Sequence, residues 1–235
     1  MAHVNEPRLF DEYATKYSTT VQDVIGASGE SVEYFARLKI DLMRDALAGE
    51  SVETILDFGC GIGNTTRELA TQFPTAAITG YDASSESIAV ARGLTSEDGR
   101  TSFMEAEDDR LPFADESFDA AFTACVFHHI ERAEHGSWAR ELLRVLRPGG
   151  TLFLFEHNPY NPLTRKVVRE CAFDEGVILL EPGYARRMLG EAGFLAGSPK
   201  FYFFFPHVLK ALRPGERALR RVPFGAQYYV VGRRP

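Results

Sequence analysis

A short apolar run leads into a glycine-rich turn and a helical segment at Ile55-Leu56-Asp57-Phe58-Gly59-Cys60-Gly61-Ile62-Gly63-Asn64. The pattern predicts a buried β-strand over 52–58 and a helix over 64–73. Glycines let a backbone turn tightly and approach a ligand, and the first turn of a helix offers unpaired N–H groups to that ligand. The stretch therefore predicts a ligand-binding turn between the first strand and first helix of an α/β sheet.

Outward from this turn, β-rich runs alternate with helical stretches. Further strands are expected at 76–82, 101–105, 118–126 and 151–156, with helices at 84–93 and 137–146. Such alternation is typical of a parallel sheet with helices on both faces. Two aromatic runs, 201–205 and 227–232, predict an antiparallel pair at the end of the sheet. The expected fold is α/β, with a seven-stranded, mostly parallel sheet.

Three parts of one continuous domain are expected. Residues 1–50 form an N-terminal helical cap or lid, because apolar residues recur at three- and four-residue spacing from Val32 to Ala46. Residues 51–157 form the ligand-binding core. Residues 158–235 supply substrate-side helices and the final antiparallel strands. The cap is expected over the carboxyl edge of the sheet, where open α/β folds bind ligands.

Three motifs follow the D-x-G-x-G-x-G turn in order. Asp82 closes the second strand, A-E-D-D-R-L-P-F with S-F-D covers 106–119, and L-R-V-L-R-P-G-G covers 143–150. Together the four motifs resemble the class I S-adenosylmethionine-dependent methyltransferases over residues 53 to 157, in particular the small-molecule type. The resemblance implies a Rossmann-like fold, S-adenosyl-L-methionine as cofactor and methyl transfer as the activity.

The resemblance also implies which residues hold the cofactor. Asp82 would accept hydrogen bonds from ribose hydroxyls, and Glu107 or Asp108 would contact the adenine. Tyr17 lies in a segment similar to the family's lid helix and would close over the cofactor. The implied cofactor-binding set is Tyr17, Asp57, Gly59, Cys60, Gly61, Gly63, Asp82, Ala83, Glu107, Asp108 and Cys125.

Candidate catalytic residues follow the fourth and fifth strands: His128, His129, Glu156 and His157. A histidine suits a general base at neutral pH. If strand geometry persists, alternation sends the members of each pair to opposite sides, so at most one of each pair faces the substrate. Two histidines and a carboxylate can also bind iron. No metal is predicted, because the tight ligand spacing of a metal site is missing.

Other functions remain open. Asn64 stands where the third glycine of a dinucleotide fingerprint would fall, which disfavours a nicotinamide-dependent oxidoreductase. A regulator that binds the cofactor without turnover is a second alternative. A net charge of −7 disfavours a nucleic-acid partner, and the motif of nucleic-acid amino-methylases is missing. A small-molecule acceptor is expected, with oxygen ahead of carbon or nitrogen because candidate bases are present.

Composition sets the expected surroundings. Three cysteines indicate a reducing compartment, and neither a secretory signal nor an apolar run of about 20 residues occurs, so a cytoplasmic protein is expected. From Phe205 to Pro235, seven Lys/Arg accompany a single acid, Glu216, giving that stretch a charge of +6. This is either a solvated basic face or a surface for an anionic or amphiphilic substrate or a lipid headgroup. The oligomeric state is not predicted.

Overall fold

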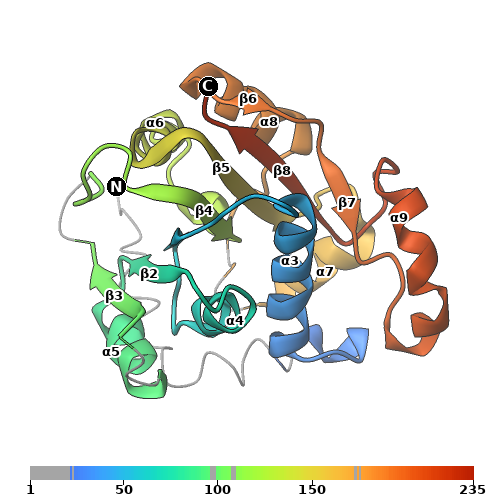
Figure 1. The fold of residues 1–235 in the computed structure, drawn as a ribbon. Helices are drawn as coiled ribbons and strands as arrows, with labels where there is room; N and C mark the ends of the chain where they lie inside the picture. Colours follow the sequence, from blue (N-terminus) through green and yellow to red (C-terminus); the bar gives the residue numbers. More distant parts are fainter. Residues whose placement is uncertain (1–21, 23, 96–98, 107–109, 172–173, 175) are drawn as a thin grey trace.

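The computed structural model describes residues 22, 24–95, 99–106, 110–171, 174 and 176–235. At its centre is an eight-stranded sheet in the order β3-β2-β1-β4-β5-β8-β6, with β7 also paired to β8 (Figure 1). The first five strands in that order are parallel, and β8 is antiparallel to β5. The strand bounds are β1 Thr54–Phe58, β2 Ala77–Asp82, β3 Thr101–Glu105, β4 Phe118–Ala124, β5 Leu146–His157, β6 Leu195–Ala196, β7 Lys200–Tyr202 and β8 Gln227–Arg233.

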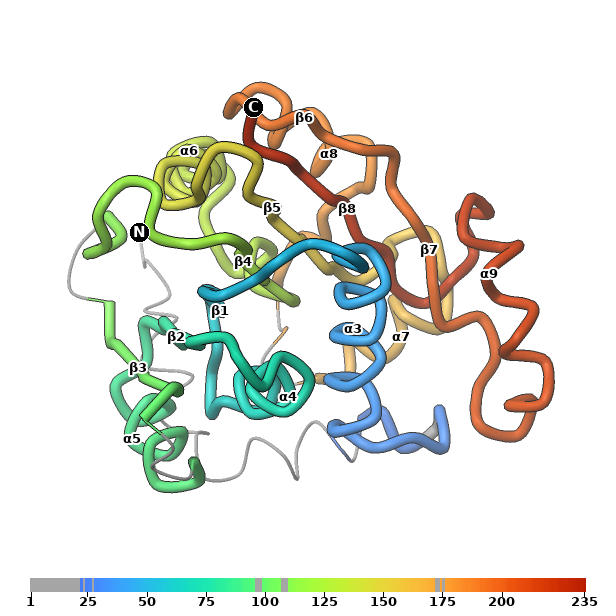
Figure 2. Tube along the Cα trace, viewed as in Figure 1, coloured from blue at the N-terminus to red at the C-terminus, as the bar shows by residue number. Residues whose placement is uncertain are grey.

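Helices cover both faces of the sheet, giving three layers (Figure 2). Helices α3 (Val32–Ala46) and α4 (Asn64–Gln72) lie side by side on one face, where they share an apolar core with β1, β4 and β5. Helices α6 (His135–Val145) and α8 (Pro182–Ala192) pack together on the other face. The remaining helices of the described residues are α5 (Ser85–Leu94), α7 (Pro162–Glu170), α9 (Glu216–Leu219) and the 3₁₀ helices η1 (Gly26–Ser28), η2 (Phe127–His129) and η4 (His207–Gly215).

The parallel half of the sheet confirms the expected α/β fold. Every expected strand and helix of the core is present, with ends shifted by a few residues except for β5, which begins five residues earlier. Ser84 caps α5 as expected, since its hydroxyl accepts the Ser87 N–H at 3.0 Å. The sheet has eight strands rather than seven, because two short segments, β6 and β7, each pair with β8.

The aromatic run over 201–205 is not one strand. The chain leaves the sheet after Tyr202, and Phe203 takes a left-handed φ of 57°. The carboxylate of Glu216 then accepts the backbone N–H groups of Phe203, Phe204 and Phe205 at 3.0–3.1 Å. These three donors have a carboxylate partner in place of a ladder partner, which ends the strand.

The N-terminal helix α3 forms as expected, but it packs on a face of the sheet rather than over its edge. Arg37 bonds Glu68 and Arg44 bonds Gln72, so α3 runs in the same direction as α4. Only the first residues of α3 therefore lie at the carboxyl edge of the sheet. Residues 1–21, including Tyr17, lie outside the described residues, so the division into cap, core and substrate side stays a prediction. None of the described helices has the length and apolar character that a bilayer crossing requires.

Candidate active site

The glycine turn after β1 adopts a backbone that side chains resist. Gly59, Gly61 and Gly63 all have left-handed φ values, of 76°, 50° and 76°. A Cβ at Gly59 would lie 2.2 Å from Val126, whereas one at Gly61 would meet no atom of the described residues within 4 Å. Gly59 is therefore needed for packing against the loop after β4, and Gly61 borders open space that a ligand can fill.

The residues around this turn provide groups that suit the expected cofactor. The N-cap of helix α4 is Gly63, which has no side chain to accept the N–H groups of the first turn. The Asp82 carboxylate accepts the Gly61 N–H at 2.7 Å and the Ser84 N–H at 2.9 Å, which fixes it at the end of β2. Ala83 follows it on the surface. An open glycine, a helix N-terminus and a fixed carboxylate fit an aminoacyl nucleoside such as S-adenosylmethionine.

Asp57 has a different environment from Asp82. Its carboxylate is buried and accepts the Thr66 hydroxyl at 2.7 Å, which ties α4 to β1. Burial raises the pKa of Asp57 to about 7, although the Thr66 hydroxyl opposes the rise. The side chain therefore holds the helix that follows the turn, and a direct contact of Asp57 with the cofactor stays a prediction.

Neither cysteine near the turn is suited to nucleophilic chemistry. Burial raises the pKa of the Cys60 thiol well above its usual value, and it raises that of Cys125 to about 11. Cys125 has a left-handed φ of 59° and donates its N–H to the Phe155 carbonyl at 2.9 Å. This single residue ends β4 and turns the chain into η2.

The candidate catalytic residues come together at the carboxyl ends of β4 and β5. The imidazole of His128 lies between two carboxylates, with Nδ1 2.6 Å from Glu156 Oε2 and Nε2 3.3 Å from Asp174 Oδ1. His129 Nε2 lies 3.3 Å from the same Asp174 oxygen. The expected alternation of the two histidines is wrong, because residues 127–129 form a 3₁₀ helix rather than a strand.

The two histidines differ in charge. His128 is fully buried, yet its pKa is raised well above the usual range, because the attraction of Glu156 and Asp174 outweighs the cost of burial. The His129 side chain is 13% exposed, and burial lowers its pKa despite the bond to Asp174. His128 is therefore a protonated ring that bonds Glu156 and Asp174, whereas His129 is a neutral imidazole at pH 7.

His157 and Lys39 line the same region. Burial and the nearby His128 charge lower the pKa of His157 to about 4, so its ring is neutral. Lys39 projects from α3 and is only 8% exposed, and burial lowers its pKa even though Cys125 and Glu156 oppose the shift. Its ammonium lies 5.8 Å from the Phe35 ring centre. Three separate elements thus place titratable groups around this end of the sheet.

Among the described residues, one group has the composition of a metal site. Ligand atoms of His128, His157 and Asp174 lie within 4.8 Å of one another. Both nitrogens of His128 already bond carboxylates, and Asp174 is shared between two histidines. The group is best described as a hydrogen-bond network, and we assign no metal to it.

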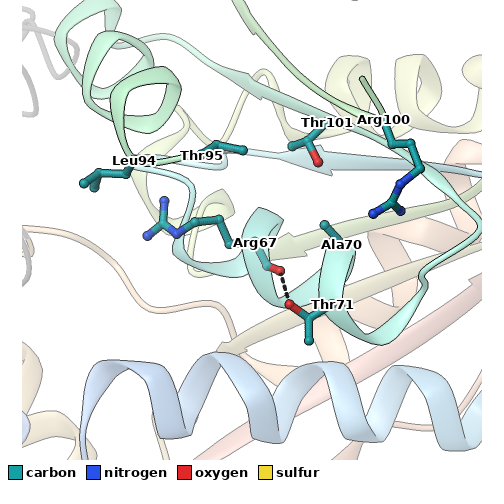
Figure 3. Close-up of a pocket in the computed structure, with 7 residues that line it drawn as sticks. All are labelled: Arg67, Ala70, Thr71, Leu94, Thr95, Arg100 and Thr101. Carbon is teal, nitrogen blue, oxygen red and sulfur yellow. Dashed lines mark hydrogen bonds between the residues drawn. The ribbon is translucent and has the colours of Figure 1, made fainter. Parts of the chain in front are cut away.

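A surface hollow of about 430 Å³ lies elsewhere. Figure 3 shows it between α4, the end of α5 and the start of β3, with Arg67 and Arg100 projecting from its walls. Thr101 begins β3, so this hollow lies toward the amino ends of the parallel strands. It is separate from the cluster of histidines.

Two residues of the site have no sequence motif. Asp174 lies between α7 and α8, 46 residues from His128, and no pattern in the sequence marks it. Lys39 also belongs to no motif, but the sequence contains a signal for it, because a charged residue four positions after Phe35 interrupts the apolar face of α3. Glu107 and Asp108, expected near the adenine, lie outside the described residues.

Comparison with known proteins shows which family has this sequence and fold. A family model described as a methyltransferase domain matches residues 55–150. Demethylmenaquinone methyltransferase from Chlorobaculum parvum is 34% identical over 160 residues, which are 68% of this chain and 63% of the relative. The C-methyltransferase UbiE of ubiquinone/menaquinone biosynthesis from Ectopseudomonas mendocina is 31% identical over 179 residues, 66% of this chain and 69% of the relative.

The chain spans slightly less than two thirds of the first two curated relatives that it matches, 63% and 64% of their lengths. Among solved structures, a SAM-dependent methyltransferase from Thermotoga maritima superposes with a TM-score of 0.66 at 17% identity, covering 97% of this chain and 99% of that one. This likeness confirms the Rossmann-like fold. From the family model, the identity to these enzymes and the four motifs, the chain belongs to the class I S-adenosylmethionine-dependent methyltransferases.

Proposed function

We propose that this protein transfers a methyl group from S-adenosyl-L-methionine to a ring carbon of a small, electron-rich aromatic acceptor of the hydroquinone type. The observation that carries the proposal is the placement of the glycine turn, Asp82 and the histidine cluster at one edge of the sheet. The names of the relatives, which are demethylmenaquinone and C-methyltransferases, support the choice of acceptor and of carbon.

On the cofactor side, the proposed contacts follow the local geometry. When bound, the cofactor supplies a methyl group on a sulfonium, already a good electrophile. Asp82 would accept from the ribose hydroxyls, and the N-terminus of α4 would receive the carboxylate. Gly61 would allow close approach of the cofactor, whereas the contacts of Ala83 and Cys125 are predictions from the resemblance. The contacts of Tyr17, Glu107 and Asp108 remain predictions from the resemblance.

On the acceptor side, we assign the proton acceptor to His129. Its pKa is lowered by burial, so the ring is neutral at pH 7, and Asp174 Oδ1 holds its Nε2 at 3.3 Å. His129 would take the proton of a hydroquinone O–H, so that the ring carbon beside the resulting oxyanion could accept the methyl group while the methyl–sulfur bond breaks and S-adenosylhomocysteine leaves. The ring proton would then pass to water, which restores aromaticity. His128 and Glu156 position Asp174 and η2, and neutral His157 borders the acceptor.

Three alternatives give different results. Oxygen was the first acceptor expected from the candidate bases, and an O-methyl product would favour it over carbon. A regulator would bind S-adenosylhomocysteine without consuming the methyl donor. A nicotinamide oxidoreductase would bind NADH instead.

The test combines binding with product analysis. Purified protein would receive S-adenosylmethionine with a methyl-labelled sulfonium and a reduced naphthoquinone that lacks its ring methyl, and NMR would locate the label. We expect a carbon-bound methyl group and a turnover at least tenfold lower in His129→Asn, with binding of S-adenosylhomocysteine by calorimetry preserved. Cofactor binding without any labelled product, or equal turnover in His129→Asn, would contradict the assignment.

A further inference from the structure

Exposed apolar side chains gather at the edge of the sheet where the candidate active site lies. His157 at the end of β5 pairs with Gln227 at the start of β8, which pairs with Tyr202 at the end of β7. The segments joined to these strand ends therefore share one edge with the loop that carries Asp174. These segments and that loop carry seven exposed large apolar residues: Tyr160 (49%), Leu163 (72%), Ile178 (76%), Val208 (85%), Leu209 (45%), Leu212 (52%) and Phe224 (66%).

Two of these segments are strongly basic, whereas the loop that carries Ile178 is acidic, since residues 171–181 contain three acids and no Lys/Arg. Residues 158–170 and 206–225 contain eight Lys/Arg and two glutamates, in a chain whose net charge is −7. Neither glutamate is a free counter-charge, because Glu170 pairs with Lys166 and Glu216 accepts three backbone N–H groups. We call residues 158–170, Ile178 and 206–225 the rim surface. It combines exposed apolar groups with a net positive charge, although two of its arginines, Arg213 and Arg217, pair with Glu30 and Asp45 outside it.

Part of the rim surface is anchored so that its apolar side chains stay outside. In η4, His207 and Arg213 turn toward the body of the protein, where they bond Glu30 at 3.0 and 2.7 Å. Val208, Lys210 and Leu212 are exposed on the same short helix. Figure 1 shows this segment standing at the outer side of the molecule, beyond β7.

We propose that the rim surface docks on a membrane surface that contains anionic phospholipid. Apolar side chains that enter the headgroup boundary, together with basic side chains that attract anionic lipid, are the requirements for peripheral binding. The rim surface supplies both, and it adjoins the site into which an amphiphilic acceptor would pass from the lipid. Docking involves neither the cofactor nor the acceptor, so its test is independent of the proposed function.

The experiment is sedimentation of the full chain with vesicles of phosphatidylcholine alone or with phosphatidylglycerol. We expect binding only to the anionic vesicles, and weaker binding at high salt. Lys210→Gln with Arg221→Gln should weaken binding about thirtyfold, since each neutralised basic residue costs about fivefold. Val208→Asp with Leu212→Asp should abolish it. Neither pair should change the melting temperature by more than a few degrees, because these side chains are exposed.

Matched controls are found away from this edge. Leu195 is 65% exposed on β6, beside Arg233 and the amino end of β5, and Leu195→Asp should leave vesicle binding unchanged. Arg140→Gln on α6 serves the same purpose for charge. Equal binding to neutral vesicles, equal loss in the controls, or no vesicle binding would overturn the proposal. The last result, with a dimer that the Val208→Asp and Leu212→Asp pair dissociates, would assign the rim surface to a second copy of the chain.

Discussion

The bond between His128 and Glu156 gives the sharpest test of the site. Glu156 is 1% exposed, with Oε2 2.6 Å from His128 Nδ1 and Oε1 accepting the Phe127 N–H at 3.0 Å. Glu156→Gln keeps the shape but removes the charge. Breaking a buried ion pair from one side costs about 3–5 kcal/mol, because the remaining charge stays buried without its partner. We expect that loss in Glu156→Gln and in His128→Asn.

The pH at which the pair is measured decides the size of the effect. The pKa of Glu156 is lowered because His128 outweighs burial, so its contribution is present above the usual carboxylate range and lost as pH falls. The pKa of His128 is raised, so its contribution is fully present below about pH 6.5 and lost as pH rises through the raised value. At pH 6 both groups are charged in the folded protein.

A double-mutant cycle at pH 6 measures the coupling. Urea unfolding can be followed by the fluorescence of the single tryptophan, Trp138, which packs 5.4 Å from Phe58. We expect the double variant to lose about 2–3 kcal/mol less than the two single variants together. Additivity within about 0.5 kcal/mol would refute a charged His128–Glu156 pair. The coupling should also shrink as pH rises through the raised pKa of His128.

Three further predictions follow from single sites. Gly59→Ala should lower the free energy of unfolding by about 1–3 kcal/mol, because the added Cβ would lie 2.2 Å from Val126. Gly61→Ala should lower it by only about 1 kcal/mol in a thermal melt, but calorimetry should show S-adenosylhomocysteine binding weakened at least tenfold. His157→Gln should remove a loss of roughly 3 kcal/mol that the wild type shows in urea unfolding as pH falls from 6.5 to 4, because the fold favours the neutral imidazole; an unchanged pH slope would contradict the low pKa. Glu216→Gln should cost about 1–3 kcal/mol by weakening three backbone hydrogen bonds, and hydrogen exchange should quicken at Phe203–Phe205.

Most of the fold is predictable because its determinants are local. Apolar runs, the glycine turn and the Ser84 cap each specify one element through neighbours in the chain. The end of β7 is not local, because it depends on Glu216, which approaches the Phe203–Phe205 backbone from a helix further along. The packing of α3 is also tertiary. Its apolar face predicts burial but does not specify whether the sheet's face or edge provides the partner.

The candidate site likewise combines residues that local sequence motifs predict with one residue that they do not. The turn glycines and Asp82 follow from motif and strand order, and the structure brings them together as expected. The contribution of Asp174 is invisible in the sequence because a lone acid in a loop has no periodicity or spacing. Yet Asp174 bonds both His128 and His129, so the network cannot be assigned without it.

The roles of two adjacent histidines are decided by one backbone conformation. In a continuing strand, His128 and His129 would point to opposite faces. The left-handed Cys125 instead turns the chain into η2, and both rings reach Asp174, with ring centres 4.2 Å apart. Only His128 also reaches Glu156, so the positive charge resides on the inner ring and its repulsion helps keep the outer ring neutral. The proposed proton abstraction by His129 at pH 7 requires a neutral outer ring, because a base must arrive without a proton, and the charge on His128 favours that neutral state.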